Sequence, residues 1–326
     1  MVPLSDRPPV LAAWGAGVDS TAMLVELVER GEPVDQVLFA DVGAEKRETL
    51  AFVPVFRGWL AERGVPSAIV RYAPKNFKNW PAYRTLTENL LTNGTLPGIA
   101  FGRGTCSQKW KAAPQHAWAR TWPPAIAAWA AGRRVVKLIG YDASPADDRR
   151  YRAVQSLDDP LYEHRYPLRE WGWRRDDCER RIAAAGLPVP PKSACFYCTA
   201  ARPAEIRGLP RAQLRQIVLI EARAKPRLRN VEGLWRQTVK GARGATPRPG
   251  SMTAFIRQEG LLDPAEIEAI AALAPRSLLR WQAAVAQSEG ARPEMARWMT
   301  VFDAFAGDPG DMDSAPSLYA GLERRS

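Results

Sequence analysis

The chain has 326 residues, 46% of them hydrophobic and 25% charged, which allows a large buried core and excludes a wholly disordered chain. Its two histidines, His116 and His164, are too few for a histidine-rich metal site and too far apart in the sequence for an HExxH motif. No stretch approaches the ~18 consecutive apolar residues of a membrane helix, and residues 1–10 lack an apolar signal-peptide core. We therefore expect a cytoplasmic protein with no membrane partner, whose four cysteines are metal ligands or reactive thiols rather than disulfides.

Nearly all of the net charge of +11 lies in one stretch of the chain. Residues 201–258 contain 13 Lys and Arg against 3 Asp and Glu, a net charge of +10. Such a block can neutralise phosphates, which favours a nucleic acid substrate as partner. The alternative is a solvated arginine-rich face, since only Trp235 and Phe255 are prominent aromatic residues there.

Strand and helix patterns alternate over the first seventy residues. Residues 10–14, 36–40 and 67–72 predict strands, and helical patterns lie between them at about 19–30 and 47–63. This alternation is typical of a parallel sheet covered by helices. We therefore predict an α/β fold with a doubly wound parallel sheet.

The pattern continues to about residue 200. We expect a helix over 76–91, a long glycine-rich loop over 92–105, a helix carrying Trp110, Trp118 and Trp129 that breaks at Pro123-Pro124, a buried strand over 135–139, a helix over 174–185 and a Pro-rich loop over 187–194. After Cys198 only helices are predicted, over 203–225, 264–274 and 275–288. We therefore place one domain at 1–200 and a basic, all-helical region at 201–326.

The first predicted strand is followed by GAGVDST, residues 15–21, and then by a helix. Glycines let backbone N–H groups approach an anion, and the helix N-terminus adds about half a positive charge. Ser20 and Thr21 add hydroxyl donors. The segment is neither a Walker A motif nor GxGxxG, because no GK[ST] follows and Ser20 stands at the third glycine. Taken alone, it fits a phosphate site or an ordinary strand-to-helix turn.

GAGVDST resembles the PP-loop of N-type ATP pyrophosphatases, SGGxDS, and especially that of the phosphoadenosine phosphosulfate (PAPS) reductase-like branch. Gly15 stands for the family's serine and so lacks its hydroxyl, while Ala16 and Gly17 stand for the two glycines. Further segments match in the family's order over about residues 8–205: Asp41-Val42-Gly43 with Glu48-Thr49, Arg103 and Cys106-Ser107 with Lys111 and Pro114, Gly140 to Arg149, Tyr166-Pro167-Leu168 with Trp171, and Cys195-Phe196-Tyr197-Cys198.

The resemblance implies an adenine nucleotide alpha hydrolase-like fold that binds ATP with Mg²⁺. The residues it assigns to the nucleotide are Gly15, Ala16, Gly17, Val18, Asp19, Ser20, Thr21, Asp41 and Gly140, and those it assigns to catalysis are Asp19, Ser20, Cys106 and Lys111. Adenylation of a substrate would release pyrophosphate, and a sulfur species would then displace AMP. The implied activity is thiolation, on nucleic acid if the basic block binds it, with a sulfur-donor protein as partner.

Position alone also favours a ligand at Asp41, because open α/β sheets bind ligands at the carboxyl ends of their strands. Asp41 would hold the nucleotide ribose or a magnesium ion. The alternative for Asp41 is a helix cap, and for Lys111 a solvated helix lysine.

Three interpretations of the cysteines stay open. Cys106 with the CxxC pair Cys195 and Cys198 is suitable spacing for soft metals. In similar tRNA-thiolating proteins three cysteines hold a cluster, expected here to be 4Fe-4S, with one iron free for sulfide, and Ser107 replaces the fourth ligand. A four-cysteine site, zinc or iron–sulfur, would include Cys178, although the neighbouring carboxylates oppose its thiolate. Alternatively, Cys178 is buried and the CxxC is inert.

Two other functions remain. A PAPS or APS reductase is one, but such enzymes carry a nucleophilic cysteine in a C-terminal motif, and no cysteine follows Cys198. The other is a nucleic-acid-binding module with a structural metal and an inactive loop.

Overall fold

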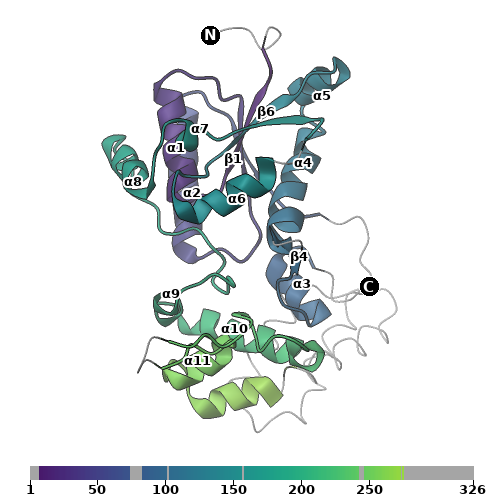
Figure 1. Ribbon diagram of the computed structural model, residues 1–326, viewed down its shortest axis with the longest axis vertical. Helices are drawn as coiled ribbons and strands as arrows, with labels where there is room; N and C mark the ends of the chain where they lie inside the picture. Colours follow the sequence, from purple (N-terminus) through teal and green to yellow (C-terminus); the bar gives the residue numbers. More distant parts are fainter. Residues whose placement is uncertain are drawn as a thin grey trace, which may run out of the picture. The chain divides into compact units, whose positions relative to one another are not determined.

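The computed structural model describes residues 7–73, 83–100, 103–155, 158–241, 246–272 and 274 (Figure 1). The chain forms two compact units, which we call unit 1 (Met1–Tyr72 and Ser107–Cys195) and unit 2 (Ala73–Cys106 and Phe196–Ser326). The last crossing between them lies near the boundary predicted at residue 200, whereas the inclusion of 73–106 in unit 2 was not predicted. Over the described residues, no helix combines the length and apolar character that a membrane span requires.

Unit 1 is built on a five-stranded sheet in which all neighbouring strands are parallel. The strand order is β3-β2-β1-β6-β7, with β1 Val10–Trp14, β2 Gln36–Ala40, β3 Ser67–Val70, β6 Val135–Ile139 and β7 Tyr162–Arg165. In the register, Leu11 lies opposite Gln36 on one side and Lys137 on the other. The predicted α/β class and parallel sheet are confirmed.

Helices cover both faces of this sheet, because alternate strand residues point to opposite sides. One face packs on α1 Val18–Glu29, α2 Arg47–Glu62, α7 Pro167–Glu170 and α8 Arg175–Ala184, and the other on α4 Ala113–Ala119 and α5 Pro123–Ala130. A π-helical turn, Ser107–Ala112, precedes α4, and α6 Pro145–Gln155 follows β6. The arrangement is compatible with a doubly wound fold.

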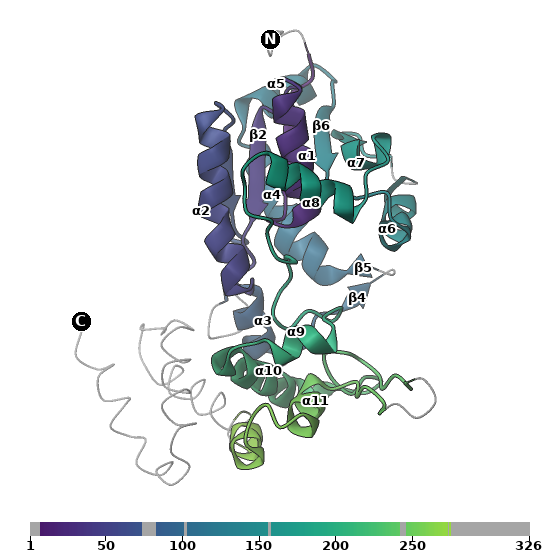
Figure 2. The same cartoon turned by 90° about the vertical axis from the view of Figure 1, so that its left-hand side faces the viewer.

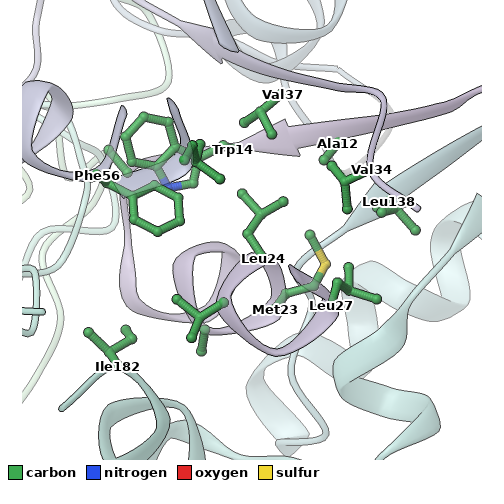
Figure 3. Close-up of a cluster of buried hydrophobic side chains, with 14 of the residues drawn as sticks. Ala12, Trp14, Met23, Leu24, Leu27, Val34, Val37, Phe56, Leu138 and Ile182 are labelled. Atoms are coloured by element: carbon green, nitrogen blue, oxygen red, sulfur yellow. The ribbon is translucent and has the colours of Figure 1, made fainter. Parts of the chain in front are cut away.

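The larger core lies between the sheet and α1 (Figure 3). Met23, Leu24 and Leu27 of α1 point toward Ala12, Trp14 and Val37 of the central strands. The centre of the Trp14 ring lies 4.9 Å from that of Phe56 on α2. Ile182 of α8 belongs to the same core, and α8 packs against α1 (Figure 2). This packing fixes where the N-terminus of α1 stands relative to the ends of the strands.

Unit 2 consists mainly of helices in the described residues. Its elements are α3 Leu86–Asn93, the two-stranded antiparallel β4 Ile99–Ala100 and β5 Arg103–Gly104, α9 Pro203–Arg207, α10 Arg211–Ala224, the short 3₁₀ turn Lys225–Arg227 and α11 Met252–Gln258. The single helix predicted over 203–225 is wrong, because Gly208 and Pro210 separate α9 from α10. Residues 264–272 are helical, as predicted, while 275–288 lie outside the described residues.

The carboxylate of Glu221 on α10 holds the centre of unit 2 together. Its two oxygens accept hydrogen bonds from the backbone N–H groups of Leu234, Met252 and Thr253 at 2.6–2.9 Å, and from the Ser251 hydroxyl at 2.6 Å. Only 6% of Glu221 is exposed. This one side chain therefore fixes both the 233–235 turn and the N-terminus of α11.

Candidate functional site

The site lies where the topology of the sheet reverses. β1 has β2 on one side and β6 on the other, so the chain leaves β1 and β6 on either side of the same crevice. Residues 15–17 follow β1, and Gly140 follows β6. In open α/β sheets, ligands bind outside the carboxyl ends of the strands at such a switch point. The predicted GAGVDST loop and Gly140 therefore stand at the position where the fold itself favours a ligand.

The GAGVDST loop adopts a sharp strand-to-helix turn. Ala16 has a φ of +54°, a left-handed conformation that is costly for a residue with a Cβ. Gly17 is the N-cap of α1 in an extended conformation, and it has no side chain that could cap the helix. The first N–H groups of α1 therefore remain for an anion. The Ser20 hydroxyl accepts a hydrogen bond from the Gly15 N–H at 3.1 Å, which closes the turn.

Thr21 does not face the crevice as the sequence suggested. Its side chain is fully buried, and its hydroxyl accepts a hydrogen bond from the Trp14 indole at 2.9 Å. Thr21 therefore joins β1 to α1 inside the core. Of the two hydroxyls predicted as donors, Ser20 is the one that remains at the loop.

Gly140 is required by a close approach between β6 and α1. A Cβ placed on Gly140 would lie 2.7 Å from Ser20 Cα and 2.8 Å from Ser20 N. Side-chain atoms do not approach backbone this closely, so only glycine lets the end of β6 reach the first turn of α1. The position predicted to contact the nucleotide thus has a packing role at the same crevice.

Asp19 lies beside an arginine that the sequence did not single out. The Arg175 guanidinium donates a hydrogen bond to Asp19 Oδ1 at 3.0 Å. Burial raises the pKa of Asp19, Arg175 opposes that rise, and the carboxylates of Asp142 and Asp147 add to it. Asp19 therefore belongs to a partly buried group of acids, in which Arg175 is its own guanidinium partner.

Asp142 and Asp147 come from the turn after β6 and were missed by the sequence analysis. Asp142 Oδ1 accepts hydrogen bonds from the N–H of Ser144 at 3.0 Å and from its hydroxyl at 2.5 Å. Asp147 accepts from the Asp142 N–H at 3.3 Å and from Arg150 at 3.1 Å. Both carboxylates are buried and already hydrogen-bonded, and they act on Asp19 through their charge. Their one sequence signal was the glycine-led turn.

Asp41 is held by neighbours at the end of β2. One oxygen accepts from the Gly43 N–H at 2.8 Å, and the other pairs with the Arg71 guanidinium at 2.7 Å. This carboxylate joins β2 to the end of β3. Its predicted contact with a ribose or a magnesium ion remains a proposal, and such a contact competes with Arg71.

Glu45 is a buried carboxylate that the sequence analysis did not identify. Its side chain is 0% exposed, and neither oxygen has a hydrogen-bond partner. Lys111 Nζ lies 3.5 Å from Glu45 Oε1, so the lysine predicted from the motif forms an ion pair with a buried acid. Glu45 also forms an isolated antiparallel backbone bridge with Cys195.

The three cysteines predicted as metal ligands are divided between the units. Cys195 lies in unit 1, whereas Cys106 and Cys198 lie in unit 2, and all three are partly exposed. Within the described ranges, no three Cys, His, Asp or Glu side chains are grouped so that they could hold a metal.

Cys178 differs from the other cysteines. It is fully buried on α8 and belongs to the large core, so its predicted helical position is confirmed. Burial raises the pKa of its thiol, and Asp19 and Asp142 raise it further. Asp177, one of the flanking carboxylates that the sequence argument named, adds a smaller rise, while burial has the largest effect.

The basic region contains arginines of two kinds. Many have partners: Arg207 pairs with Glu259, Arg211 and Arg215 with Glu266, and Arg257 with Glu268, at 2.6–2.9 Å, while Arg223 and Arg227 donate to the Leu91 and Asn93 carbonyls at the end of α3. Among the residues that the structure describes, Arg229, Arg236, Lys240 and Arg248 form no ion pair.

These four residues lie within residues 229–241 and 246–248, which we call the basic loop. Its base is fixed, because Glu232 accepts from the Thr238 and Gly250 N–H groups and because Val239 and Arg248 exchange backbone hydrogen bonds at 2.9 and 3.0 Å. A hollow of about 410 Å³ beside it is lined by Arg229, Asn230, Val231, Glu232, Gln237 and Thr238. Positive charge and amide groups therefore gather at one exposed place.

No protein-family model and no curated protein matches this chain. The resemblance to PP-loop enzymes accordingly rests on the residues of this sequence, and the switch point rests on the fold.

Proposed function

We propose that this chain is an ATP-dependent enzyme of the PP-loop ATP pyrophosphatase type, similar to the PAPS reductase-like branch. ATP with Mg²⁺ would bind at residues 15–21, and the enzyme would adenylate a substrate and release pyrophosphate before sulfur transfer. The observation that carries the proposal is the pairing of the GAGVDST loop with Gly140 at the switch point of the sheet.

The proposed adenylation uses groups that this loop provides. The free N–H groups at the start of α1 and the Ser20 hydroxyl would bind the phosphate oxygens, and the Asp19 carboxylate would be the ligand that the protein offers to Mg²⁺. A substrate oxygen attacks the α-phosphorus, the bond to the bridging β-phosphate oxygen breaks, and pyrophosphate leaves. The N–H groups and the Ser20 hydroxyl stabilise the negative charge that develops on the phosphate oxygens. A magnesium ion, when bound, would supply further charge stabilisation.

In the second step, a sulfur nucleophile forms the new bond to the substrate carbon while the carbon–oxygen bond to AMP breaks. The oxidation states of carbon and sulfur do not change in this exchange. The sulfur nucleophile is delivered by a donor protein. An iron–sulfur cluster on Cys106, Cys195 and Cys198 remains part of the proposal through the sequence resemblance alone, because the described residues present no three-ligand group, and no step here depends on it.

Nucleic acid is the substrate class that we propose. The charges without ion pairs on the basic loop support it, because each can neutralise a phosphate without first breaking an internal salt bridge. Asn230 and Gln237 beside them offer amide groups of the kind that read base edges.

Pyrophosphate release from ATP tests the proposal. We expect Mg²⁺-dependent release that nucleic acid stimulates, and a loss of at least about a hundredfold in Asp19→Ala and Ser20→Ala because both remove groups from the charge-stabilising site. Gly58→Ala on α2 serves as the matched control, since its new methyl group meets nothing within 4 Å. The proposal fails if the purified protein neither binds ATP nor releases pyrophosphate with DNA, RNA or small metabolites present. Sulfite release from PAPS in place of pyrophosphate release from ATP would indicate the reductase instead.

A further inference from the structure

A short segment before the CxxC pair lies across the GAGVDST loop. We call residues 193–195 the strap. The Ser193 hydroxyl donates a hydrogen bond to the Gly15 carbonyl, although 178 positions separate the two residues. A Cβ placed on Gly17 would lie 3.2 Å from Ser193 Cβ. The absence of a side chain at Gly17 thus allows the strap to pack directly on the loop.

The other end of the strap is paired through its backbone with Glu45. Cys195 and Glu45 are partners in an antiparallel bridge, and side chains of such partners project to the same side, with Cβ atoms about 4.5–5.5 Å apart. The Glu45 oxygens accept no hydrogen bond, but Lys111 Nζ lies 3.5 Å from Oε1 and forms an ion pair with it. The strap is therefore held at both ends, by the loop at Ser193 and by Glu45 at Cys195.

We propose that Ser193 is a phosphate-binding residue of this site, contributed by the strap. The inference rests on the proposed nucleotide site and adds a residue that the sequence motif does not contain. Position 15 of the loop carries no hydroxyl, because glycine occupies it, and Ser20 supplies the one that the loop itself offers. Ser193 lies near the C-terminal end of the sequence of unit 1, and its hydroxyl contacts the loop at Gly15.

For Ser193 to bind a phosphate, only its hydroxyl has to reorient. A serine has a single O–H donor, which the Gly15 carbonyl takes in the structure. When a phosphate oxygen enters the loop, that donor turns from the neutral carbonyl to the charged oxygen, which is the stronger acceptor. Gly15 keeps its N–H bond to Ser20, so the loop retains its shape.

Binding of Mg²⁺–ATP, measured by calorimetry, tests this role. We expect Ser193→Ala to weaken binding about tenfold to a hundredfold, the usual effect of losing a hydrogen bond to a charged group. Ser193→Thr, which keeps the hydroxyl, should stay close to wild type. Ser67→Ala on β3 is the control, because that hydroxyl accepts from Arg57 instead.

A second pair of variants tests the contact between the strap and the loop. Gly17→Ala places a methyl group against Ser193 Cβ and should weaken binding. In a Ser193→Gly background that contact is absent, so the same Gly17→Ala change should cost clearly less, a non-additive result. Circular dichroism on each variant checks that the fold is kept.

The outcomes separate the two proposals. If wild type binds ATP and Ser193→Ala binds it within twofold, Ser193 has no phosphate role, while the nucleotide site stands. Equal effects of Gly17→Ala in both backgrounds would likewise overturn the strap contact. If wild type binds no ATP, the nucleotide site and the role of Ser193 are both overturned.

Discussion

The ammonium group of Lys137 lies 5.1 Å from the centre of the Tyr162 ring, inside the sheet face that α4 and α5 cover. Only 8% of Lys137 is exposed. The side chains around it are His164 and Tyr162 on β7 and His116 on α4, whose Nδ1 lies 3.0 Å from the Tyr162 hydroxyl, and Asp159 acts on Lys137 from before β7. Both histidines of the chain are therefore near one buried lysine.

Replacing Lys137 with methionine should stabilise the protein at pH 7. Burial lowers the pKa of Lys137 from 10.5 to about 8, so the unfolded chain binds this proton more tightly than the folded one. The penalty is complete below pH 8 and disappears by about pH 10.5. We expect Lys137→Met to raise the free energy of unfolding by up to about 3 kcal/mol at pH 7 and by little at pH 10.5. Urea titrations at both pH values check this, and equal gains at both would contradict the electrostatic origin.

The same cluster should make the protein sensitive to acid. Burial lowers the pKa of His116 and of His164, and the charge of Lys137 lowers both further. The unfolded chain therefore takes up these protons first as the pH falls, and stability declines below about pH 6.5. Because Lys137→Met removes one of the like charges, its stability should decline less steeply from pH 7 to pH 5 in the same titrations.

Gly140→Ala should disturb both folding and nucleotide binding. The new methyl group would collide with the Ser20 backbone, and overpacking of this kind costs about 1–3 kcal/mol. Relief of the clash would move the start of α1, so ATP affinity should fall as well. Gly58→Ala on the exposed side of α2 should instead gain up to about 1 kcal/mol from helix propensity. Thermal melts and ATP titrations of the two variants test the contrast, and similar behaviour would exclude the close approach as the cause.

Asp19→Asn should separate stability from function. Burial raises the pKa of Asp19 more than Arg175 lowers it, so the ionised carboxylate disfavours folding at pH values above its folded pKa. The neutral amide removes that penalty, and melting temperatures at pH 7 should rise. Mg²⁺-dependent ATP binding should be lost at the same time. The control is Asp176→Asn, an exposed residue in the first turn of α8, which should change neither. A destabilised Asp19→Asn would show that the Arg175 pair dominates instead.

Glu221→Gln should weaken unit 2 selectively. The carboxylate of Glu221 accepts hydrogen bonds from buried backbone N–H groups, and the NH₂ of a glutamine cannot accept them. Some of these N–H groups would therefore be left without partners. We expect a loss of at least about 2 kcal/mol, visible as faster hydrogen exchange in α10 and α11. Glu268→Gln, which removes the exposed ion pair to Arg257, should cost less than about 0.5 kcal/mol. Uniformly faster exchange in both units would contradict a local role.

The charges without ion pairs should account for the salt dependence of nucleic acid binding. We expect Arg229→Gln with Lys240→Gln to reduce the slope of log affinity against log salt by about 0.9 for each duplex phosphate that the variant no longer neutralises. Arg207→Gln with Arg211→Gln is the matched pair, because those arginines already hold Glu259 and Glu266. If the second pair lowers the slope as much as the first, the basic loop is not the contact surface. Binding of an acidic protein but no DNA or RNA would also overturn the nucleic acid proposal.

The sequence predicted those features of the fold that residues close together in the chain determine. Apolar runs specified β1, β2 and β6, and the glycines with Asp19 placed the loop at the start of α1. It missed β7, whose sequence YEHR has no apolar run, because an edge strand carries polar side chains and is ordered by its partner.

Contacts between distant residues were beyond the sequence analysis. Ser193 reaches Gly15, Arg175 reaches Asp19, and Glu266 pairs with two arginines more than fifty positions away. Local spacing contains no record of such pairs. For the same reason, counting arginines overstated the charge that is available to a partner.

Because the chain is synthesised from its N-terminus, one contact within unit 2 can form only after a delay. The carbonyl of Leu91, near the end of α3, accepts a hydrogen bond from the Arg223 side chain. The ribosome adds Leu91 to the chain 132 residues before Arg223. At roughly 5–20 residues per second, α3 waits roughly 7 to 26 seconds for this partner. An isolated helix of eight residues is marginal in water, so we expect α3 to stay unfolded until α10 has been made, whereas α1 can pack on β1 and β2 earlier. A nascent chain arrested shortly before Arg223 should therefore be cut by protease within 83–94 and resist cleavage in α1.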